Sequence, residues 1–148
     1  MRAAEMFEEF PVVGQDSDAL QAARLLAERR LPGLVVIDTD GVPVALLPAS
    51  EVVQFLVPSY VQDDPSLAGV LDESMSDHLA DRLAGRSVRS LLPRQTPELP
   101  RVEIDDTLVE VAAVMARMRC PMVAVMQGRR LAGVVTASRL LEIALDHH

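Results

Sequence analysis

The hydrophobic and polar positions follow one order of patterns twice along the chain. In the first half, apolar residues recur at helical spacing, Pro32-Gly33 stops the helix, and two short aliphatic runs flank a Gly-containing turn. Such spacing predicts an amphipathic helix, and paired aliphatic runs about a turn predict a β-hairpin. The predicted order is strand, helix, strand, strand and helix, at residues 10–13, 20–31, 34–37, 44–47 and 49–56.

The same order returns in the second half. Thr107 and Glu110 have the spacing of a capping box at the start of a helical stripe, and Pro121 ends that helix. A strand, a turn, a returning strand and a final helix follow. The predicted elements lie at residues 102–104, 108–118, 123–126, 131–135 and 137–145.

The two halves are related by a nearly constant offset of 88 or 89 positions. Three pairs show it: Asp18 and Asp106, Pro32 and Pro121, and Ser50 and Ser138. Matching positions in one order at one offset indicate an internal repeat. Units of roughly 50 residues bury too little surface to fold well alone. We therefore expect an α/β (α+β) fold in which two β-α-β-β-α repeats pack through their sheets about a pseudo-twofold axis.

A segment with a different pattern separates the repeats. Asp64-Pro65 is a typical helix start and Gly85 a typical helix end. The apolar positions between them are Leu67, Val70, Leu71, Met75, Leu79 and Leu83. Their spacing predicts one long amphipathic helix laid on a core or on a partner. The expected divisions are 5–57 for the first repeat, 58–86 for the inserted segment and 87–146 for the second repeat.

Composition narrows the classes of protein. The chain has 148 residues, of which 49% are hydrophobic but only 3% aromatic, so the core must be aliphatic. A formal net charge of −8 disfavours a general nucleic-acid binder, which needs a basic face. No apolar run approaches a membrane span and the acidic start lacks the features of a signal peptide. These observations indicate a cytoplasmic protein with no membrane insertion.

Enzyme chemistry finds no support in the motifs. The sequence contains no Ser/His/Asp signature, no phosphate loop, no dinucleotide glycine pattern and no cluster with metal-ligand spacing. Cys120 is the single cysteine, which rules out a disulfide framework, and a buried inert thiol is favoured over a nucleophile. We therefore predict a protein that is not an enzyme and holds no metal.

One stretch near the C-terminus suggests a binding site. Residues 133–141 read as the end of a buried strand running directly into a helix, with Thr136 and Ser138 at the junction. The N-terminus of a helix presents unpaired N–H groups and can receive a phosphate or a ribose. A weaker copy occupies residues 45–53. The hydroxyls can equally serve only as helix caps, and both interpretations stay open.

These features resemble the CBS domain, named after cystathionine β-synthase. The resemblance rests on the first helix, the proline before an aliphatic strand, the Gly-containing hairpin, and the motif Gly133-x-x-Thr136-x-x-Arg139. It covers residues 5–145 apart from the inserted segment. The family implies a tandem pair that binds adenosine-containing ligands such as AMP, ADP, ATP or S-adenosylmethionine between its repeats. It also implies dimerisation into flat discs and regulation of another protein.

The motifs depart from the nucleotide-binding pattern of the family, which ends in Gly-h-x-Thr/Ser-x-x-Asp. In the second repeat Arg139 replaces the Asp, and in the first Ala45, Pro48 and Glu51 replace Gly, Thr and Asp. Arg139 and Glu51 can also be ordinary solvated residues of a first helical turn. The resemblance implies these candidate ligand-binding residues: Thr136, Ser138, Arg139, Pro121, Met122, Gly133, Ser50 and Glu51.

Two functions follow from this pattern. The first is a sensor module that binds an adenosine-containing ligand and modulates a partner protein. The second is a dimeric CBS-fold scaffold or regulatory subunit that has lost ligand binding. If a ligand binds, a phosphorylated one should favour the cleft of Thr136 and Arg139, and a neutral or cationic one the cleft of Glu51. The aliphatic helices of both repeats predict a homodimer, with the inserted helix covering or extending its interface.

Overall fold

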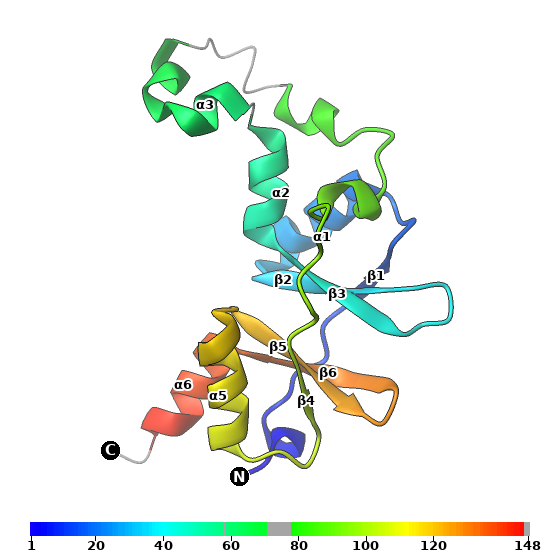
Figure 1. Ribbon diagram of the computed structural model, residues 1–148, viewed down its shortest axis with the longest axis vertical. Helices are drawn as coiled ribbons and strands as arrows, with labels where there is room; N and C mark the ends of the chain where they lie inside the picture. The colour runs from blue at the N-terminus through cyan, green and yellow to red at the C-terminus, as the bar shows by residue number, and fades with distance from the viewer. Residues whose placement is uncertain (58, 71–77, 147–148) are drawn as a thin grey trace.

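The computed structural model describes residues 1–57, 59–70 and 78–146, and it shows two similar units stacked along the long axis (Figure 1). The first unit consists of β1 (Val12–Gly14), α1 (Ala19–Arg29), β2 (Gly33–Ile37), β3 (Pro43–Pro48) and α2 (Ala49–Leu56). The second consists of β4 (Arg101–Glu103), α5 (Leu108–Met118), β5 (Met122–Gln127), β6 (Arg130–Thr136) and α6 (Ala137–Leu145). Short 3-10 helices are η1 (Ala3–Glu5), η2 (Pro65–Val70), η3 (Leu79–Arg82) and η4 (Val88–Leu91), and α3 spans Ser59–Asp63.

The two sheets have the same topology. In each, the first strand runs parallel to the middle strand, and the middle strand pairs antiparallel with the third. Each hairpin also carries a register shift, between Val36 and Ile37 in the first repeat and between Val125 and Met126 in the second. The shared irregularity falls 89 positions apart, so the internal repeat predicted from the sequence is confirmed down to the register of its strands.

The helix ends follow from local sequence. Asp18 caps α1, and Thr107 with Glu110 forms the predicted capping box at the start of α5. Arg30 and Arg119 end the two helices in the left-handed region, at φ 51° and φ 50°. Arginine pays a steric cost there that glycine would avoid. An arginine in this uncommon conformation therefore ends the first helix of both repeats. Each of the two arginines lies at the start of the loop that leads into the middle strand.

The core forms three clusters. One lies between each sheet and its own helices. The third lies between the sheets, where its buried members are Val35, Leu99, Met122, Ala124, Met126 and Val134. Each sheet therefore buries both faces, as the continuous apolar runs of β2 and β5 require. The repeats face each other through their sheets, as expected from their small size.

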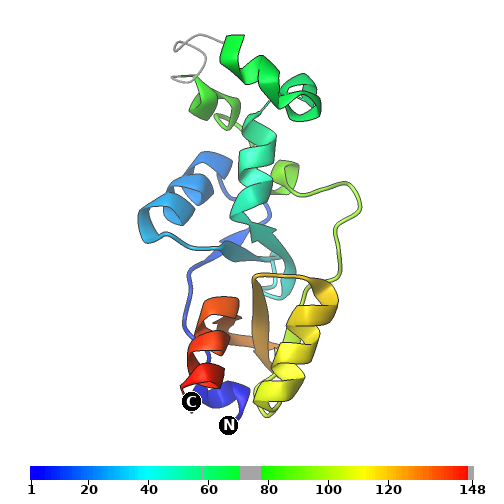
Figure 2. The ribbon, with the colours of Figure 1, turned by 90° about the vertical axis from the view of Figure 1, so that its left-hand side faces the viewer.

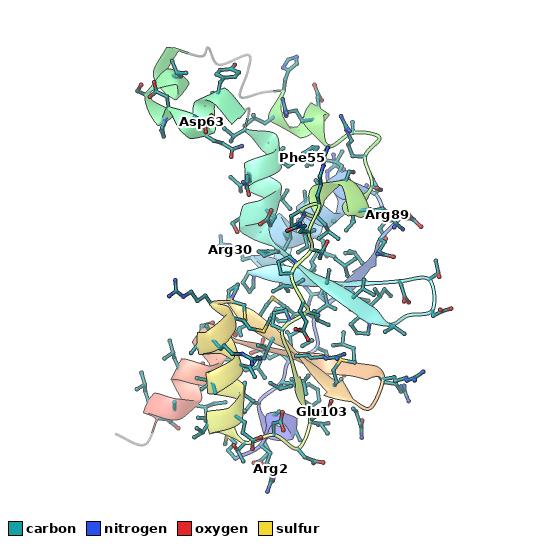
Figure 3. The ribbon with its side chains drawn as sticks, in the orientation of Figure 1. Arg2, Arg30, Phe55, Asp63, Arg89 and Glu103 are labelled. Atoms are coloured by element: carbon teal, nitrogen blue, oxygen red, sulfur yellow. The ribbon has the colours of Figure 1, made fainter. Side chains whose placement is uncertain are left out.

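The segments that lead into each repeat pack on the opposite repeat. Ala3 and Met6 are fully buried in the core of the second repeat, while Val88 and Leu91 belong to the core of the first. Arg2 contacts the backbone of Asp105 at one end of the molecule (Figure 3). Figure 3 also shows Arg89 on the first repeat, where it forms an exposed ion pair with Asp16. Neither repeat is complete without a segment from the other half of the chain.

Gly133 is the position where the N-terminal segment, which packs on the second repeat, meets the second sheet. Glu8 and Val134 exchange two backbone hydrogen bonds of 2.8 Å. A Cβ atom on Gly133 would lie 2.5 Å from the Glu8 carbonyl oxygen and 2.6 Å from the Phe7 ring. Glycine is thus needed here for close approach of protein backbone.

The inserted segment is not the single long helix predicted over residues 64–85. The described residues form α3, η2 and η3 instead, and Leu71 and Met75 lie outside them. Pro65 separates α3 from η2, because the residue before a proline disfavours the α region. Leu83 is buried in the core of the first repeat. The packing of Leu83 in that core, and not the helical spacing of the apolar residues, determines the local structure here. The segment projects beyond the first repeat (Figures 1 and 2).

We expect Gly133→Ala to lower the free energy of unfolding by about 1–3 kcal/mol, the usual range for overpacking a filled site. The added methyl group must push Phe7 and Glu8 away from β6. Urea denaturation followed by circular dichroism measures the loss. Gly69→Ala is the matched control, because nothing lies within 4 Å of its Cβ position. Equal stability of the two variants would contradict the tight contact at Gly133.

Candidate functional site

Two pockets occupy equivalent places in the pseudo-symmetric molecule. Each joins the strand–helix junction of one repeat to the loop before the middle strand of the other. We call them the Glu51 cleft, of about 180 Å³, and the Thr136 cleft, of about 410 Å³. The Glu51 cleft is lined by Leu46, Pro48, Glu51, Pro93, Pro97, Glu98, Pro100 and Met118 to Pro121. The Thr136 cleft is lined by Glu8, Phe10, Arg29 to Pro32, Thr136, Ser138, Arg139 and Glu142.

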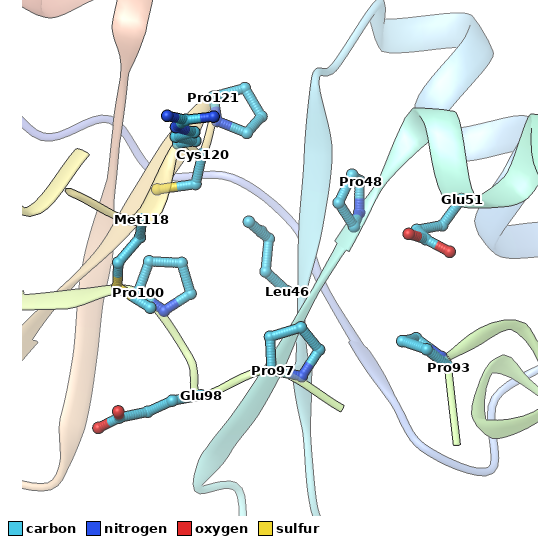
Figure 4. Close-up of a pocket in the computed structure, with 11 residues that line it drawn as sticks. Leu46, Pro48, Glu51, Pro93, Pro97, Glu98, Pro100, Met118, Cys120 and Pro121 are labelled. Atoms are coloured by element: carbon cyan, nitrogen blue, oxygen red, sulfur yellow. The ribbon is translucent and has the colours of Figure 1, made fainter. Parts of the chain in front are cut away.

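The Glu51 cleft is apolar and carries a negative balance of charge. Five of its lining residues are prolines, which offer flat apolar surfaces without backbone donors (Figure 4). Its charged residues are Glu51, Glu98 and Arg119. Pro48 stands at the N-cap of α2 and makes no side-chain capping bond, so this helix start lacks the capping hydroxyl that Thr136 gives to α6. The surroundings suit a neutral or cationic group better than a phosphate.

The Thr136 cleft is built on a capped helix start. Thr136 is 7% exposed, and its Oγ1 accepts a hydrogen bond of 3.1 Å from the backbone N–H of Arg139. Its hydroxyl also lies 3.3 Å from the Ser138 hydroxyl. The capping role considered from the sequence is therefore present, and Ser138 remains exposed at the mouth of the cleft.

Arginines from both repeats converge on the Thr136 cleft. Arg139 comes from the second repeat, whereas Arg29 and Arg30 come from the end of α1 in the first. Arg139 is paired with Glu142 at 2.6 Å between Nη1 and Oε1, and Glu8 is the other acidic lining residue. The lining therefore holds three guanidinium groups and two carboxylates, and the net formal charge of the cleft is positive. Planar guanidinium groups bind phosphate through paired hydrogen bonds, so this cleft suits an anionic ligand.

The sequence did not point to Arg29 and Arg30 as site residues. They lie about a hundred positions from Thr136 along the chain, and only the facing of the two sheets brings them together. A signal was nevertheless present. Arg29-Arg30-Leu31-Pro32 aligns with Met118-Arg119-Cys120-Pro121 at the repeat offset, and Pro121 was already a candidate. Applying the offset to Pro121 identifies Pro32 and the two arginines before it.

The other candidate ligand-binding residues predicted from the sequence do not line the Thr136 cleft. Pro121 lines the Glu51 cleft with its ring, although its carbonyl oxygen accepts a 2.8 Å hydrogen bond from the backbone N–H of Ala137, next to Thr136. Met122 is fully buried between the sheets, and Gly133 admits the backbone of Glu8. Ser50 is exposed on the first turn of α2. The structure thus brings together Thr136, Ser138 and Arg139 in one cleft, and Glu51 with Pro121 in the other.

Cys120 is half-buried at the edge of the Glu51 cleft. Burial raises the pKa of its thiol, and backbone hydrogen bonds at Cys120 and Met122 oppose that rise only in part. In the described part of the chain, no three His, Cys, Asp or Glu residues are grouped so as to hold a metal ion. Every helix in the same residues is too short or too polar to cross a bilayer.

Comparison with known proteins agrees with this architecture. The family model described as "CBS domain" matches residues 3–58 and 88–146, so the chain belongs to the CBS domain family and carries a tandem pair. A crystal structure of a CBS domain-containing protein of unknown function from Kribbella flavida is 62% identical, with a TM-score of 0.85. That match covers 98% of this chain and 99% of the other. A search of curated proteins found no match.

Two more distant structures share the fold and hold adenosine compounds. CBSX2 in complex with AMP is 17% identical, with a TM-score of 0.69, and the match covers 99% of this chain and 97% of CBSX2. The CBS domain pair of protein MJ0100 is bound to 5′-methylthioadenosine and S-adenosyl-L-methionine. It is 15% identical, with a TM-score of 0.67 and coverage of 100% and 98%.

We expect Cys120 to react slowly with an aromatic disulfide reagent at pH 8, compared with an unstructured cysteine peptide. A raised pKa leaves less thiolate, which is the nucleophile. Its rate should keep rising with pH after that of the peptide has levelled off. Absorbance of the released thiolate measures both, and the same protein in urea is the control. A folded rate equal to that of the peptide would contradict the burial of the thiol.

Proposed function

We propose that this protein is a regulatory module that binds an adenosine-containing ligand in a cleft between its repeats and modulates a partner protein. The observation that carries the proposal is the Thr136 cleft, where a capped helix start of one repeat faces Arg29 and Arg30 of the other. The AMP complex of CBSX2 and the S-adenosyl-L-methionine complex of MJ0100 support this class of ligand. The partner is a separate, unidentified protein.

A ligand in either cleft touches both repeats at once. The Thr136 cleft takes residues from α1 of the first repeat and from α6 of the second. A ligand that binds one arrangement of the repeats more tightly than another shifts the population toward it. Changes in the angle between the repeats then reach their outer helices, where a regulated protein can sense them.

The two clefts favour different ligands. The arginines of the Thr136 cleft support binding of AMP, ADP or ATP through the phosphates, with the Ser138 hydroxyl as a further donor. Glu51 can accept hydrogen bonds from ribose hydroxyls, and the negative balance of its cleft favours a sulfonium ligand such as S-adenosylmethionine. The net charge of −8 argues against nucleic acid as the partner, and the single cysteine is consistent with work in the cytoplasm.

A dimeric scaffold without a ligand is the second candidate. The observation that favours it is the ion pair of Arg139 with Glu142, which occupies the cation that would meet a phosphate. The Asp typical of the nucleotide-binding motif is also absent from both repeats. Calorimetric titration with AMP, ADP, ATP and S-adenosylmethionine separates the two functions, because a scaffold shows no heat of binding with any of them.

We expect Arg139→Ala to weaken binding of a phosphorylated ligand by about 1.5–3 kcal/mol, the usual scale for a hydrogen bond to a charged group. The fold should be retained, because the side chain is a third exposed and its ion pair is on the surface. Isothermal titration calorimetry measures the change. Glu51→Ala is the matched control at the equivalent position of the other cleft. Unchanged affinity in Arg139→Ala beside a large loss in Glu51→Ala would reverse the assignment of the clefts.

We further propose that the protein is a homodimer formed through the repeat helices. Large apolar side chains on these helices are exposed: Val53 by 58%, Val109 by 73%, Leu141 by 53% and Leu145 by 60%. Exposed apolar patches on helices commonly mark an interface. Light scattering after gel filtration should give twice the 16.1 kDa of one chain at micromolar concentration. A mass of one chain would refute the dimer.

A further inference from the structure

A pocket of about 490 Å³ lies between the two hairpins, which project on the side of the molecule opposite α5 and α6 (Figure 1). The β2–β3 hairpin contributes Asp40 and Val42 to its lining, and the β5–β6 hairpin contributes Arg129, Arg130 and Leu131. We call it the hairpin pocket. It shares no residue with the Glu51 cleft or the Thr136 cleft, so it is a separate site that both repeats build.

The charged side chains of the hairpin pocket differ in sign between the repeats. Asp40 of the first repeat is its single carboxylate, and Arg129 and Arg130 of the second supply two guanidinium groups. Within the described residues, none of these three side chains forms an ion pair. The neighbouring Asp38 is engaged in its own turn, where its carboxylate accepts hydrogen bonds of 2.9 and 3.0 Å from the backbone N–H groups of Asp40 and Val42. The pocket therefore offers a carboxylate from one hairpin and two guanidinium groups from the other.

The remaining surface of the hairpin pocket is aliphatic. Val12 and Val42 line it with 40% and 38% of their surfaces exposed, and Leu131 packs against the core between the sheets. The other large apolar side chains of similar exposure in the described part of the chain lie on helices or at the N-terminus. An aliphatic group that binds in the pocket removes this apolar surface from water, which is favourable.

We propose that the hairpin pocket binds a free α-amino acid with an aliphatic side chain, of which leucine is an example. Arg129 and Arg130 hold its carboxylate, because guanidinium groups donate charge-assisted hydrogen bonds to carboxylates. Asp40 accepts hydrogen bonds from its α-ammonium group, and its side chain packs on the aliphatic part of the lining. The three parts of the pocket thus correspond to the three parts of the ligand.

Simpler ligands match only part of this lining. A lone anion brings its charge near Asp40 and leaves the aliphatic surface in water, whereas a lone cation meets two arginines. A segment inside a peptide chain lacks both the free ammonium and the free carboxylate. The inference does not rest on the proposed function, because the pocket is separate from both adenosine clefts.

Titration of the isotope-labelled full chain with L-leucine, followed through its backbone amide resonances by nuclear magnetic resonance, tests the proposal. We expect saturable shifts at Gly41, Val42 and Arg130. Isocaproate lacks the ammonium group of leucine and isoamylamine lacks its carboxylate, so each should bind about tenfold more weakly, as expected for losing a hydrogen bond between charged groups. N-acetyl-leucine amide represents a peptide segment, and binding of this probe as tight as that of leucine would overturn the proposal.

Substitutions of exposed residues assign each charge of the ligand to its partner. Asp40→Asn should weaken leucine about tenfold and leave isocaproate unchanged, because only leucine carries the ammonium group. The double variant Arg129→Ala with Arg130→Ala should weaken both ligands. Arg117→Ala on α5 is the matched control, since this exposed arginine lines neither the clefts nor the hairpin pocket, and circular dichroism verifies that every variant folds.

Three results would overturn the proposal: no shift with leucine, shifts confined to the two clefts, or the same loss of affinity in Arg117→Ala as in the double variant. Failure of the adenosine ligands to bind in calorimetry leaves the leucine titration unchanged, so the two proposals fail independently.

Discussion

The contact between the two sheets is the interaction on which the rest of this molecule depends. Each repeat has one three-stranded sheet and two main helices, and the core between them is too small to stabilise the repeat alone. Burying Met122, Met126 and Val134 between the sheets supplies the missing apolar area. The same contact creates both clefts, because it sets the strand–helix junction of each repeat against the loop of the other.

Exchange of the lead-in segments ties the repeats together further. The first residues of the chain complete the second core, and residues 86–91 complete the first. Neither repeat can unfold without exposing part of the other, so the pair should behave as one cooperative unit. Gly133 belongs to this exchange in the structure, although the motif that contains it first suggested a ligand contact. A close approach of backbone needs glycine whether the approaching group is a ligand or the protein itself.

Divergence at symmetric positions gives the two halves different roles. Glu51 and Arg139 occupy equivalent places, as do Pro48 and Thr136, and these pairs differ in charge and in hydroxyl groups. The backbone frame is shared, so the electrostatic contrast between the clefts comes almost wholly from side chains. The inserted segment adds a second asymmetry on the helical face, because η3 lines a pocket with α1 and α2 and no described part of the insertion lies over α5 and α6.

Periodicity, caps and the repeat offset were enough to predict the elements of both repeats and their packing through the sheets. Such signals are local, and an offset between halves carries the symmetry of the fold. Thr136 with Arg139, and Glu51, were likewise visible as strand–helix junctions. Three features needed the tertiary structure: Arg29 and Arg30 in the Thr136 cleft, the exchanged lead-ins, and the broken helix of residues 64–85. Each depends on contacts between residues distant in the chain, which no local pattern encodes.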